Sequence, residues 1–257
     1  MNNKTVLIVQ ARMGSTRLPG KSLMKLAGEP LIGRLLERVK RCNMIDEIVL
    51  AIPNTVSNNP LETLAKKYDV SLYRGSENDL VDRYYCAAKQ YCANLICRLP
   101  GDNPVPEPSE IDRMVEAHIK KDNNFSSNLS EMFNNGYPDG IGVEVIDFFS
   151  LEKVWKTHVN EEMREHVHLN FFNYSEQRIV DSRFQVGTVE CPESFRRPDL
   201  ILDVNTIEQY EFISELYEYL YPRNPEFHII DIIRWYDDVY MKRNFSKLTR
   251  RNNEFSY

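Results

Sequence analysis

The chain has 257 residues, of which 42% are hydrophobic and 27% charged, and its formal net charge at pH 7 is −6. This composition is ordinary for a soluble globular protein, and no apolar stretch approaches the roughly 18–20 residues that span a bilayer, so no membrane partner is expected. Because binding to a phosphate backbone depends on clustered Lys and Arg, and the chain has no long basic run, no nucleic-acid partner is expected either.

The chain opens with Met-Asn-Asn-Lys and passes directly into an apolar run, without the apolar segment of a signal peptide, so we expect a cytoplasmic protein. Apolar runs then alternate with helical patterns through the first hundred residues. Strands are predicted at residues 6–9, 47–52, 70–73 and 95–99, and helices at residues 30–41, 60–68 and 78–94. This order predicts an α/β fold with a Rossmann-like, mostly parallel sheet and helices on both faces. The ligand should bind outside the carboxyl ends of the strands.

The second half of the chain is less regular. Residues 123–145 are rich in Asn and Ser, and we expect a protruding arm at about residues 123–150. The remaining patterns predict two helices, a late strand and a helix capped by Thr206, at residues 150–158, 161–172, 199–204 and from 206 onward. We expect residues 1–240 to form a single domain and residues 241–257 a polar tail.

The loop after the first strand combines residue types that suit a polyphosphate. From residue 10 to residue 21 it reads Gln-Ala-Arg-Met-Gly-Ser-Thr-Arg-Leu-Pro-Gly-Lys. Glycine lets backbone N–H groups approach phosphate oxygens, Arg12 suits a bidentate contact, and Lys21 supplies a point charge. The loop is not a P-loop, because that motif needs glycine where Ser15 stands. On composition alone, a phosphate-binding loop and a solvated Arg-rich loop are equal alternatives.

Carboxylates at two later strand ends indicate a metal site. Asp102 follows the strand at 95–99, and Asp203 and Asn205 follow the late strand. Such ends meet at the substrate edge of a parallel sheet, and Mg²⁺ prefers oxygen ligands and arrives with phosphates. For either aspartate alone, a turn or capping role is the commoner explanation. Together, beside a basic loop, they favour a metal.

Five stretches carry a resemblance to a known family. They lie at residues 10–21, 98–104, 137–145, 164–167 and 202–206. In these stretches the sequence resembles the cytidylyltransferases that make CMP-activated acid sugars. It is closest to the spore-coat-polysaccharide-type subgroup, which is related to the CMP-ketodeoxyoctonate and CMP-sialate synthetases. The resemblance covers most of the chain.

The resemblance implies a nucleotidyltransferase that transfers CMP from CTP to an acidic sugar or related acid and releases pyrophosphate, in the biosynthesis of a surface polysaccharide or glycoconjugate. Its implied catalytic residues are Arg12, Lys21 and Asp102. Mg²⁺ would be held by Asp102 together with Asp203 or Asn205. The implied nucleotide-binding residues are Ala11, Arg12, Met13, Gly14, Ser15, Arg17, Lys21, Arg74, Gly75, Ser76, Pro100 and Gly101.

The resemblance also implies an acceptor site and a dimer. The implied acceptor residues are Tyr137, Asp139, Glu144, Arg164 and His166. Of these, Arg164 and His166 suit the carboxylate of an acidic sugar, although a packing role is an equal alternative for His166. In relatives an arm of this kind crosses to a second subunit, so we expect a homodimer with twofold symmetry.

Two departures from the family pattern leave other functions open. Relatives often carry Asp where Asn205 stands, and many carry Asp where Gly142 stands. One alternative is a nucleotidyltransferase with another base or a phosphonate acceptor. Others are a glycosyltransferase that uses a finished nucleotide-sugar and a regulatory nucleotide-binding module without turnover. The glycosyltransferase would need an Asp-x-Asp motif at a strand end, which this sequence lacks.

Overall fold

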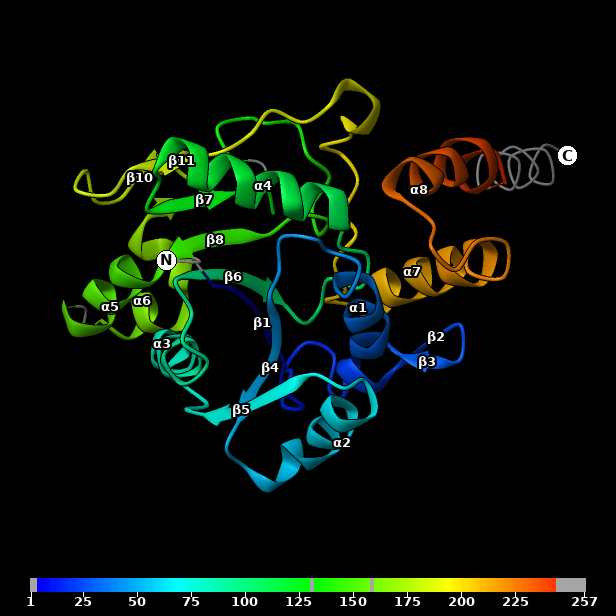
Figure 1. The fold of residues 1–257 in the computed structure, drawn as a ribbon. Coiled ribbons are helices and arrows are strands. Elements are labelled where there is room, and N and C mark those ends of the chain that lie inside the picture. Colours follow the sequence, from blue (N-terminus) through cyan, green and yellow to red (C-terminus); the bar gives the residue numbers. More distant parts are fainter. Residues whose placement is uncertain (1–3, 130–131, 158–159, 244–257) are drawn as a thin grey trace, which may run out of the picture.

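The computed structural model describes residues 4–129, 132–157 and 160–243. The described residues form a central seven-stranded sheet with the order β11-β7-β8-β6-β1-β4-β5 (Figure 1). Its strands are β1 (Thr5–Gln10), β4 (Glu47–Pro53), β5 (Ser71–Gly75), β6 (Leu95–Pro100), β7 (Phe125–Ser127), β8 (Glu144–Asp147) and β11 (Val186–Gly187). Within these ranges, no helix has both the length and the apolar character that crossing a membrane requires.

Four of these strands place the ligand site. β1 pairs in parallel with β4 on one side and with β6 on the other, and β4 pairs in parallel with β5. These are the four strands predicted for the first hundred residues, and the predicted parallel pairing is confirmed. From β1 the chain adds β4 and then β5 on one side, and it then crosses to the other side of β1 to form β6. The strand order therefore reverses between β1 and β6, where the carboxyl ends of open α/β sheets bind ligands.

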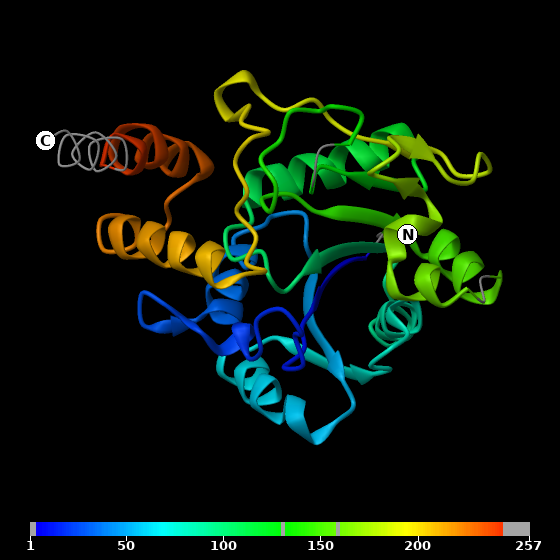
Figure 2. The same ribbon diagram turned by 180° about the vertical axis from the view of Figure 1, so that it is seen from behind.

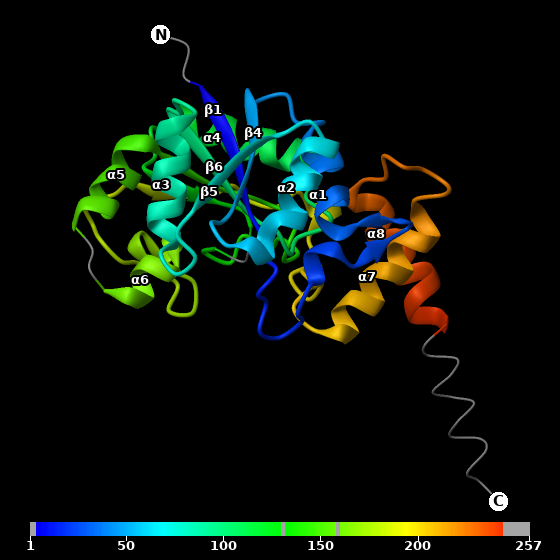
Figure 3. The ribbon, with the colours of Figure 1, turned by 90° about the horizontal axis from the view of Figure 1, so that it is seen from below.

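Helices cover both faces of the sheet, as predicted. They are α1 (Leu31–Val39), α2 (Asn59–Lys67), α3 (Leu80–Gln90), α4 (Pro108–Lys121) and α5 (Phe148–Thr157). Val6 and Ile8 of β1 pack with α3 and α5 in one hydrophobic cluster, whereas Leu7 and Val9 pack with α1, α2 and α4 in another. Figure 3 shows α3 and α5 on one side and α1 and α2 on the other. Because β1 is buried on both faces, its apolar run is continuous rather than alternating.

The C-terminal helices form a third hydrophobic cluster beside the sheet. They are α7 (Ile207–Leu220), α8 (Ile229–Trp235) and a π-helical turn at Tyr236–Tyr240. In Figures 1 and 2 they lie on the side of the molecule opposite to α5 and α6 (Glu161–Glu165). The predicted N-cap Thr206 is confirmed, since its side chain accepts a hydrogen bond from the N–H of Gln209. Of the predicted tail, residues 241–243 are helical and residues 244–257 lie outside the described residues.

Short elements complete the described part of the chain. They are the strands β2 (Lys25–Leu26), β3 (Glu29–Pro30), β9 (Phe172–Asn173) and β10 (Arg178–Ile179), and the 3-10 turns at Lys21–Leu23, Val56–Asn58, Val167–Asn170 and Glu193–Phe195. β2 pairs with β3 and β9 with β10, both antiparallel.

Two element predictions for the second half are wrong. Residues 199–204 form no strand, because the segment pairs only through a single bridge between Asp139 and Ile201. The helix predicted at 161–172 divides into α6 and a 3-10 turn, because His166 between them has a non-helical backbone (φ −114°, ψ 89°). The sequence patterns also did not predict α4 or α8.

The predicted protruding arm is also wrong for the described residues. The segment instead adds β7 and β8 to the sheet, with β8 antiparallel to both β6 and β7, and most of the residues between them are buried. Its polar side chains are bonded inside the fold. The side chain of Asn128, for example, donates to the carbonyl of Glu110 (3.0 Å) and accepts from the N–H of Val143 (2.9 Å). Residues 130–131 lie outside the described residues.

Candidate active site

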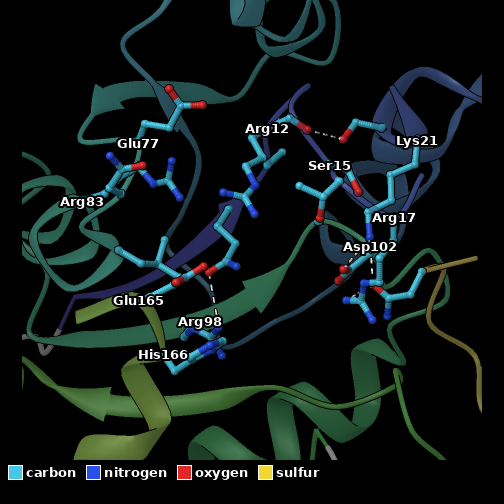
Figure 4. A pocket seen from close by; sticks show the side chains of 18 residues that line it. Arg12, Ser15, Arg17, Lys21, Glu77, Arg83, Arg98, Asp102, Glu165 and His166 are labelled. Atoms are coloured by element: carbon cyan, nitrogen blue, oxygen red, sulfur yellow. Dashed lines mark hydrogen bonds and ion pairs between the residues drawn. The ribbon is translucent and has the colours of Figure 1, made fainter. Parts of the chain in front are cut away.

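A pocket opens at the carboxyl ends of β1 and β6, between the loop after β1 and the start of α3 (Figure 4). Its lining residues are Gln10, Ala11, Arg12, Ser15, Thr16, Arg17, Lys21, Ser22, Glu77, Asn78, Leu80, Arg83, Arg98, Gly101, Asp102, Glu165, His166 and Asn205. Five of these side chains are Arg or Lys and three are carboxylates, although the whole chain is acidic. The pocket therefore attracts anionic ligands.

Local bonds close the loop after β1 into a compact turn. Gly20 has a φ of 72°, a conformation that glycine adopts without steric cost, and its N–H donates to the carbonyl of Met13 (3.2 Å). The N–H of Met13 donates in turn to the side chain of Asn58 (2.8 Å). The chain then enters the 3-10 turn that begins at Lys21. The loop thus brings both its ends, at Arg12 and Lys21, to the pocket.

The turn after β6 passes very close to β1. A Cβ atom on Gly101 would lie 2.5 Å from the carbonyl oxygen of Gln10, so a side chain does not fit here. The N–H of Gly101 donates to that same oxygen (2.8 Å). This close approach places Asp102, the next residue, beside the loop after β1.

Lys21 joins this loop to two later segments of the chain. Its Nζ donates to the carboxylate of Asp102 (2.8 Å), the carbonyl of Val204 (2.7 Å) and the side-chain oxygen of Asn205 (3.1 Å). Lys21 is 9% exposed, and three acceptors match the three donors of its ammonium group. Lys21, Asp102 and Asn205, predicted from three separate motifs, therefore meet at one point.

Asp203 lies beside this group and is less acidic than an ordinary aspartate. Burial, together with the negative charges of Asp139 and Asp102, raises the pKa of Asp203 to about 6. Asp203 also accepts a hydrogen bond from the side-chain amide of Asn205. The side-chain oxygen of Asn205 accepts from Arg17 (2.8 Å), which ties the loop after β1 to the start of α7 a second time.

The residue types at this point fit a divalent cation, but their oxygen atoms already accept hydrogen bonds from protein groups. Asp102, Asp203 and Asn205 offer the oxygen ligands that Mg²⁺ prefers. The ammonium of Lys21, however, bonds to both Asp102 and Asn205 and so takes the position of a cation. Within the described ranges, no three His, Cys, Asp or Glu side chains form a metal-binding group. A divalent cation here would therefore share Asp102 with phosphate oxygens of a substrate.

Arg98 enters the pocket from β6 with a buried counter-ion. Its guanidinium donates to Glu144 of β8 (2.6 Å) and to Gln10 (3.3 Å). Glu144 is 1% exposed and also accepts from the hydroxyl of Tyr174 (3.2 Å). Glu144, which we predicted to bind the acceptor, thus does not line the pocket. It is instead the buried counter-ion of Arg98, which does line the pocket.

The structure does not bring several predicted nucleotide-binding residues to the pocket. Arg74 and Ser76 are bonded elsewhere, Arg74 to Glu62 (2.8 Å) and Ser76 to the N–H of Asp79 (3.0 Å), and Gly75 between them does not line the pocket. Met13, Gly14 and Pro100, which were also predicted to bind the nucleotide, do not line the pocket either. The end of β5 is close to the pocket nevertheless, because Glu77 and Asn78, which follow Ser76, line it.

Of the five predicted acceptor residues, His166 alone lines the pocket in the described part of the chain. Tyr137 is buried in the third hydrophobic cluster. Arg164 forms an ion pair with Asp79 (2.5 Å) and lines a neighbouring hollow that opens beside the pocket. Asp139 lies outside the pocket, close enough to Asp203 to raise its pKa.

Arg83 lines the pocket although it is only 4% exposed, and it was not among the predicted site residues. It lies on the inner face of α3, three residues after Leu80 and four before Ala87, both of which are buried. The sequence signal that could have found Arg83 is a charged residue at a helical position whose neighbours on the same face are apolar. Glu77 and Asn78, which precede α3, and Glu165 of α6 also line the pocket without having been predicted there.

The fold thus places a pocket lined by five cationic side chains where the strand order reverses, an arrangement typical of nucleotide-binding proteins. Comparison with known families agrees, since the profile of the family described as Cytidylyltransferase matches residues 6–226. The chain therefore belongs to the cytidylyltransferase family and is an enzyme, a CTP-dependent nucleotidyltransferase.

Similar proteins support this assignment. The spore coat polysaccharide biosynthesis protein SpsF of Bacillus subtilis is 33% identical over 221 residues, which cover 84% of this chain and 87% of that protein. The structure of a cytidylyltransferase from Leptospira borgpetersenii has a TM-score of 0.81 and 31% identity, with 95% of both chains covered. The structure of CMP:2-keto-3-deoxy-manno-octonic acid synthetase complexed with CTP has a TM-score of 0.60 and 16% identity, covers 83% of this chain and 98% of that one, and supports the fold alone. The predicted family resemblance is thereby confirmed.

Proposed function

We propose that the enzyme transfers CMP from CTP to an acidic sugar or a related acid and releases pyrophosphate, as one step in making a surface polysaccharide or glycoconjugate. The names of two relatives support this acceptor class. One is the spore coat polysaccharide biosynthesis protein of Bacillus subtilis. The other is a 3-deoxy-manno-octulosonate cytidylyltransferase of Chloroherpeton thalassium, which is 32% identical over 119 residues, or 46% of this chain. Since CTP is a cytoplasmic metabolite, we place the reaction in the cytoplasm.

The meeting of Lys21, Asp102 and Asn205 is the observation that carries the proposal. Nucleotidyl transfer needs fixed positive charge for the phosphates and a carboxylate for a cation at the same place. Lys21 lies 2.8 Å from Asp102, so both requirements are met within one ion pair. A phosphate oxygen that draws Lys21 away leaves the Asp102 carboxylate free for a divalent cation, for which we propose Mg²⁺.

The pocket residues account for binding and orientation in this reaction. Arg12, Arg17 and Lys21 line the pocket and would neutralise the phosphates and the charge that develops on the departing pyrophosphate. Asp102 would hold the Mg²⁺, which would supply Lewis-acid stabilisation of that charge. The acceptor oxygen forms its bond to the α-phosphorus as the bond from this atom to the pyrophosphate oxygen breaks. The pocket must hold these groups in line.

The experiment is a matrix of nucleotides and acceptors. The purified enzyme with MgCl₂ is incubated with each of the four ribonucleoside triphosphates and each of three acids, namely 3-deoxy-manno-octulosonate, N-acetylneuraminate and a phosphonate, and pyrophosphate release is measured. We expect release with CTP and an acid sugar, and none with Asp102→Asn. Faster release with another nucleotide would contradict the use of CTP. Binding of CTP without release in any combination would instead favour a regulatory module.

A further inference from the structure

Arg83 is a buried cation without a partner in the described part of the chain. It is 4% exposed, and its Nε and Nη1 atoms are shielded from solvent without a hydrogen-bond partner. None of the ion pairs found in residues 4–129, 132–157 and 160–243 includes Arg83. Its side chain lines the pocket from α3, across from the loop after β1 (Figure 4).

Most other cations of the pocket are bonded to protein groups. Lys21 and Arg17 donate to Asn205, and Arg98 donates to Glu144. Arg12 is the exception, because its guanidinium has no hydrogen bond or ion pair with any residue that the structure describes. In Figure 4, Arg12 lies between the group of Lys21, Arg17 and Asp102 at one end of the pocket and Arg83 at the other.

An uncompensated charge at Arg83 works against the stability of the fold. Burial lowers the pKa of Arg83, and the positive charge of Arg12 acts in the same direction, whereas Glu77 opposes it. Glu77 is exposed and forms no ion pair with Arg83 in the structure. A charge that is buried without a partner costs stability, and proteins break this rule at functional sites, where a ligand can compensate the charge.

We propose that Arg83 is the centre of a second anion-binding subsite of the pocket, away from Lys21 and Asp102, which takes an anionic oxygen group of a substrate. Guanidinium groups present several fixed donors and match the oxygens of a carboxylate or a phosphate. Two substrates carry such a group, namely CTP with its phosphates and the acceptor with its acid group. This inference rests on the proposed function, because that function requires both substrates to bind in this pocket.

The layout of the pocket favours the acceptor as the source of the anion. Lys21, Arg17 and Asp102 gather at the opposite end, where the outer phosphates and a cation would bind (Figure 4). A nucleotide bound there leaves the Arg83 end for a group that arrives separately. Arg83 would then orient the acceptor through its acid group and select against neutral sugars.

The test uses two variants of Arg83 and a matched control. Arg83→Met keeps much of the length of the side chain without its charge, and Arg83→Lys keeps the charge with a different head group. Lys89→Met removes one exposed charge from the same helix and serves as the control. Because Arg83 has no internal partner, we expect Arg83→Met to unfold at a temperature higher by about 2 °C or more without ligand. Lys89→Met should match the wild type.

Two binding readouts then identify the ligand. The dissociation constant of CTP is measured by calorimetry, and the KM of the acid acceptor by pyrophosphate release. For an acceptor subsite, we expect Arg83→Met to raise the acceptor KM by about tenfold or more, with the CTP constant within about twofold of the wild type, and Arg83→Lys to recover part of the loss. A CTP constant raised by about tenfold would instead assign the subsite to a phosphate.

The outcomes separate this inference from the proposed function. CTP affinity and acceptor KM both within about twofold of the wild type would overturn the subsite, and so would an Arg83→Met protein that unfolds at a clearly lower temperature than the wild type without ligand. If none of the acids is a substrate of the wild type, the proposed acceptor class fails. The CTP measurement then decides alone, and an unchanged CTP constant overturns the subsite.

Discussion

At the scale of single residues, Lys21 occupies the position that we propose for a divalent cation. Its ammonium bonds to Asp102 and Asn205, two of the oxygen ligands that the sequence offers to a cation. Lys21 also belongs to the loop that we propose to hold the phosphates of CTP. We therefore propose that binding of the nucleotide is coupled to binding of the cation, because a phosphate that draws Lys21 away would free Asp102.

This coupling predicts that the protein alone binds a divalent cation poorly. We expect Lys21→Met to bind Mn²⁺ without nucleotide about tenfold more tightly than the wild type, since the competing ammonium is gone. The measurement is free Mn²⁺ by electron paramagnetic resonance during a titration. Lys25→Met, which changes an exposed lysine of β2, is the control. Equal Mn²⁺ affinities in the wild type and Lys21→Met would show that Lys21 does not occupy the cation position.

At the scale of elements, the start of α7 supports the site through its cap. The side-chain oxygen of Gln209 accepts from the N–H groups of Asn205 (2.7 Å) and Thr206 (3.0 Å), and its amide donates to Asp203 (3.3 Å). Thr206 makes the reciprocal bond of the capping box. The cap thus fixes both the helix and the two candidate metal ligands before it.

Two cap variants separate these roles. We expect Thr206→Ala and Gln209→Ala each to lower the free energy of unfolding by about 1 kcal/mol, because each loses a capping bond. Only Gln209→Ala also releases Asn205 and Asp203, so it should lose much more activity than Thr206→Ala. Urea unfolding and pyrophosphate release measure the two effects. Similar activities in both variants would mean that the cap stabilises the helix but does not position the site.

His118 of α4 predicts how stability depends on pH. It is 2% exposed, and burial lowers its pKa to about 4 from an ordinary 6.5. The unfolded chain therefore takes up a proton at a pH at which the folded protein does not. The stability that neutral His118 contributes is complete above pH 6.5 and is lost as the pH falls toward 4.

Replacement of His118 by Gln should remove this part of the acid sensitivity. Between pH 7 and pH 4 we expect the wild type to lose up to about 3 kcal/mol more of its free energy of unfolding than His118→Gln. Urea unfolding at several pH values measures the difference. Parallel curves for the two proteins would show that His118 is not the group that titrates.

The sequence predicted those elements whose burial is uniform. β1, β4 and β6 are mostly buried apolar runs between turns, so their pattern identifies them directly. β7 and β8 are three and four residues long, and β7 contains two buried serines. Their own pattern therefore does not identify them, and their place in the sheet depends on the pairing of β8 with β6 and of β7 with β8. The strand predicted at 199–204 was wrong because an apolar run does not by itself show sheet pairing. This run packs in the third hydrophobic cluster and pairs only through one bridge.

The same distinction holds for the site. Asp102 and Asn205 were predictable because each follows an apolar segment of the chain, and the topology brings such ends together. The bonding partners of Glu144 and Arg164 were not predictable. Glu144 accepts from Arg98, 46 positions away, and Arg164 donates to Asp79, 85 positions away, and no sequence pattern links residues that far apart. Arg83 depends on which face of α3 meets the pocket, and that follows only from the packing of the helix.

At the scale of the whole molecule, the oligomeric state remains a prediction. The family resemblance implies a homodimer, but its proposed arm is folded into the sheet within the described residues. The chain has a mass of 30.2 kDa, so light scattering of a dimer should give about twice that value. A mass equal to that of one chain, at concentrations used for activity assays, would contradict the prediction.

The whole account depends on CTP being held between the loop after β1 and Asp102. Calorimetric titration of the wild type with CTP in the presence of MgCl₂ tests this most directly, with UTP and ATP as competitors and Asp102→Asn as the comparison. We predict saturable binding of CTP that is tighter than that of UTP or ATP and weaker in Asp102→Asn. Absence of binding for every ribonucleoside triphosphate at millimolar concentration, with Mg²⁺ in excess, would contradict the account.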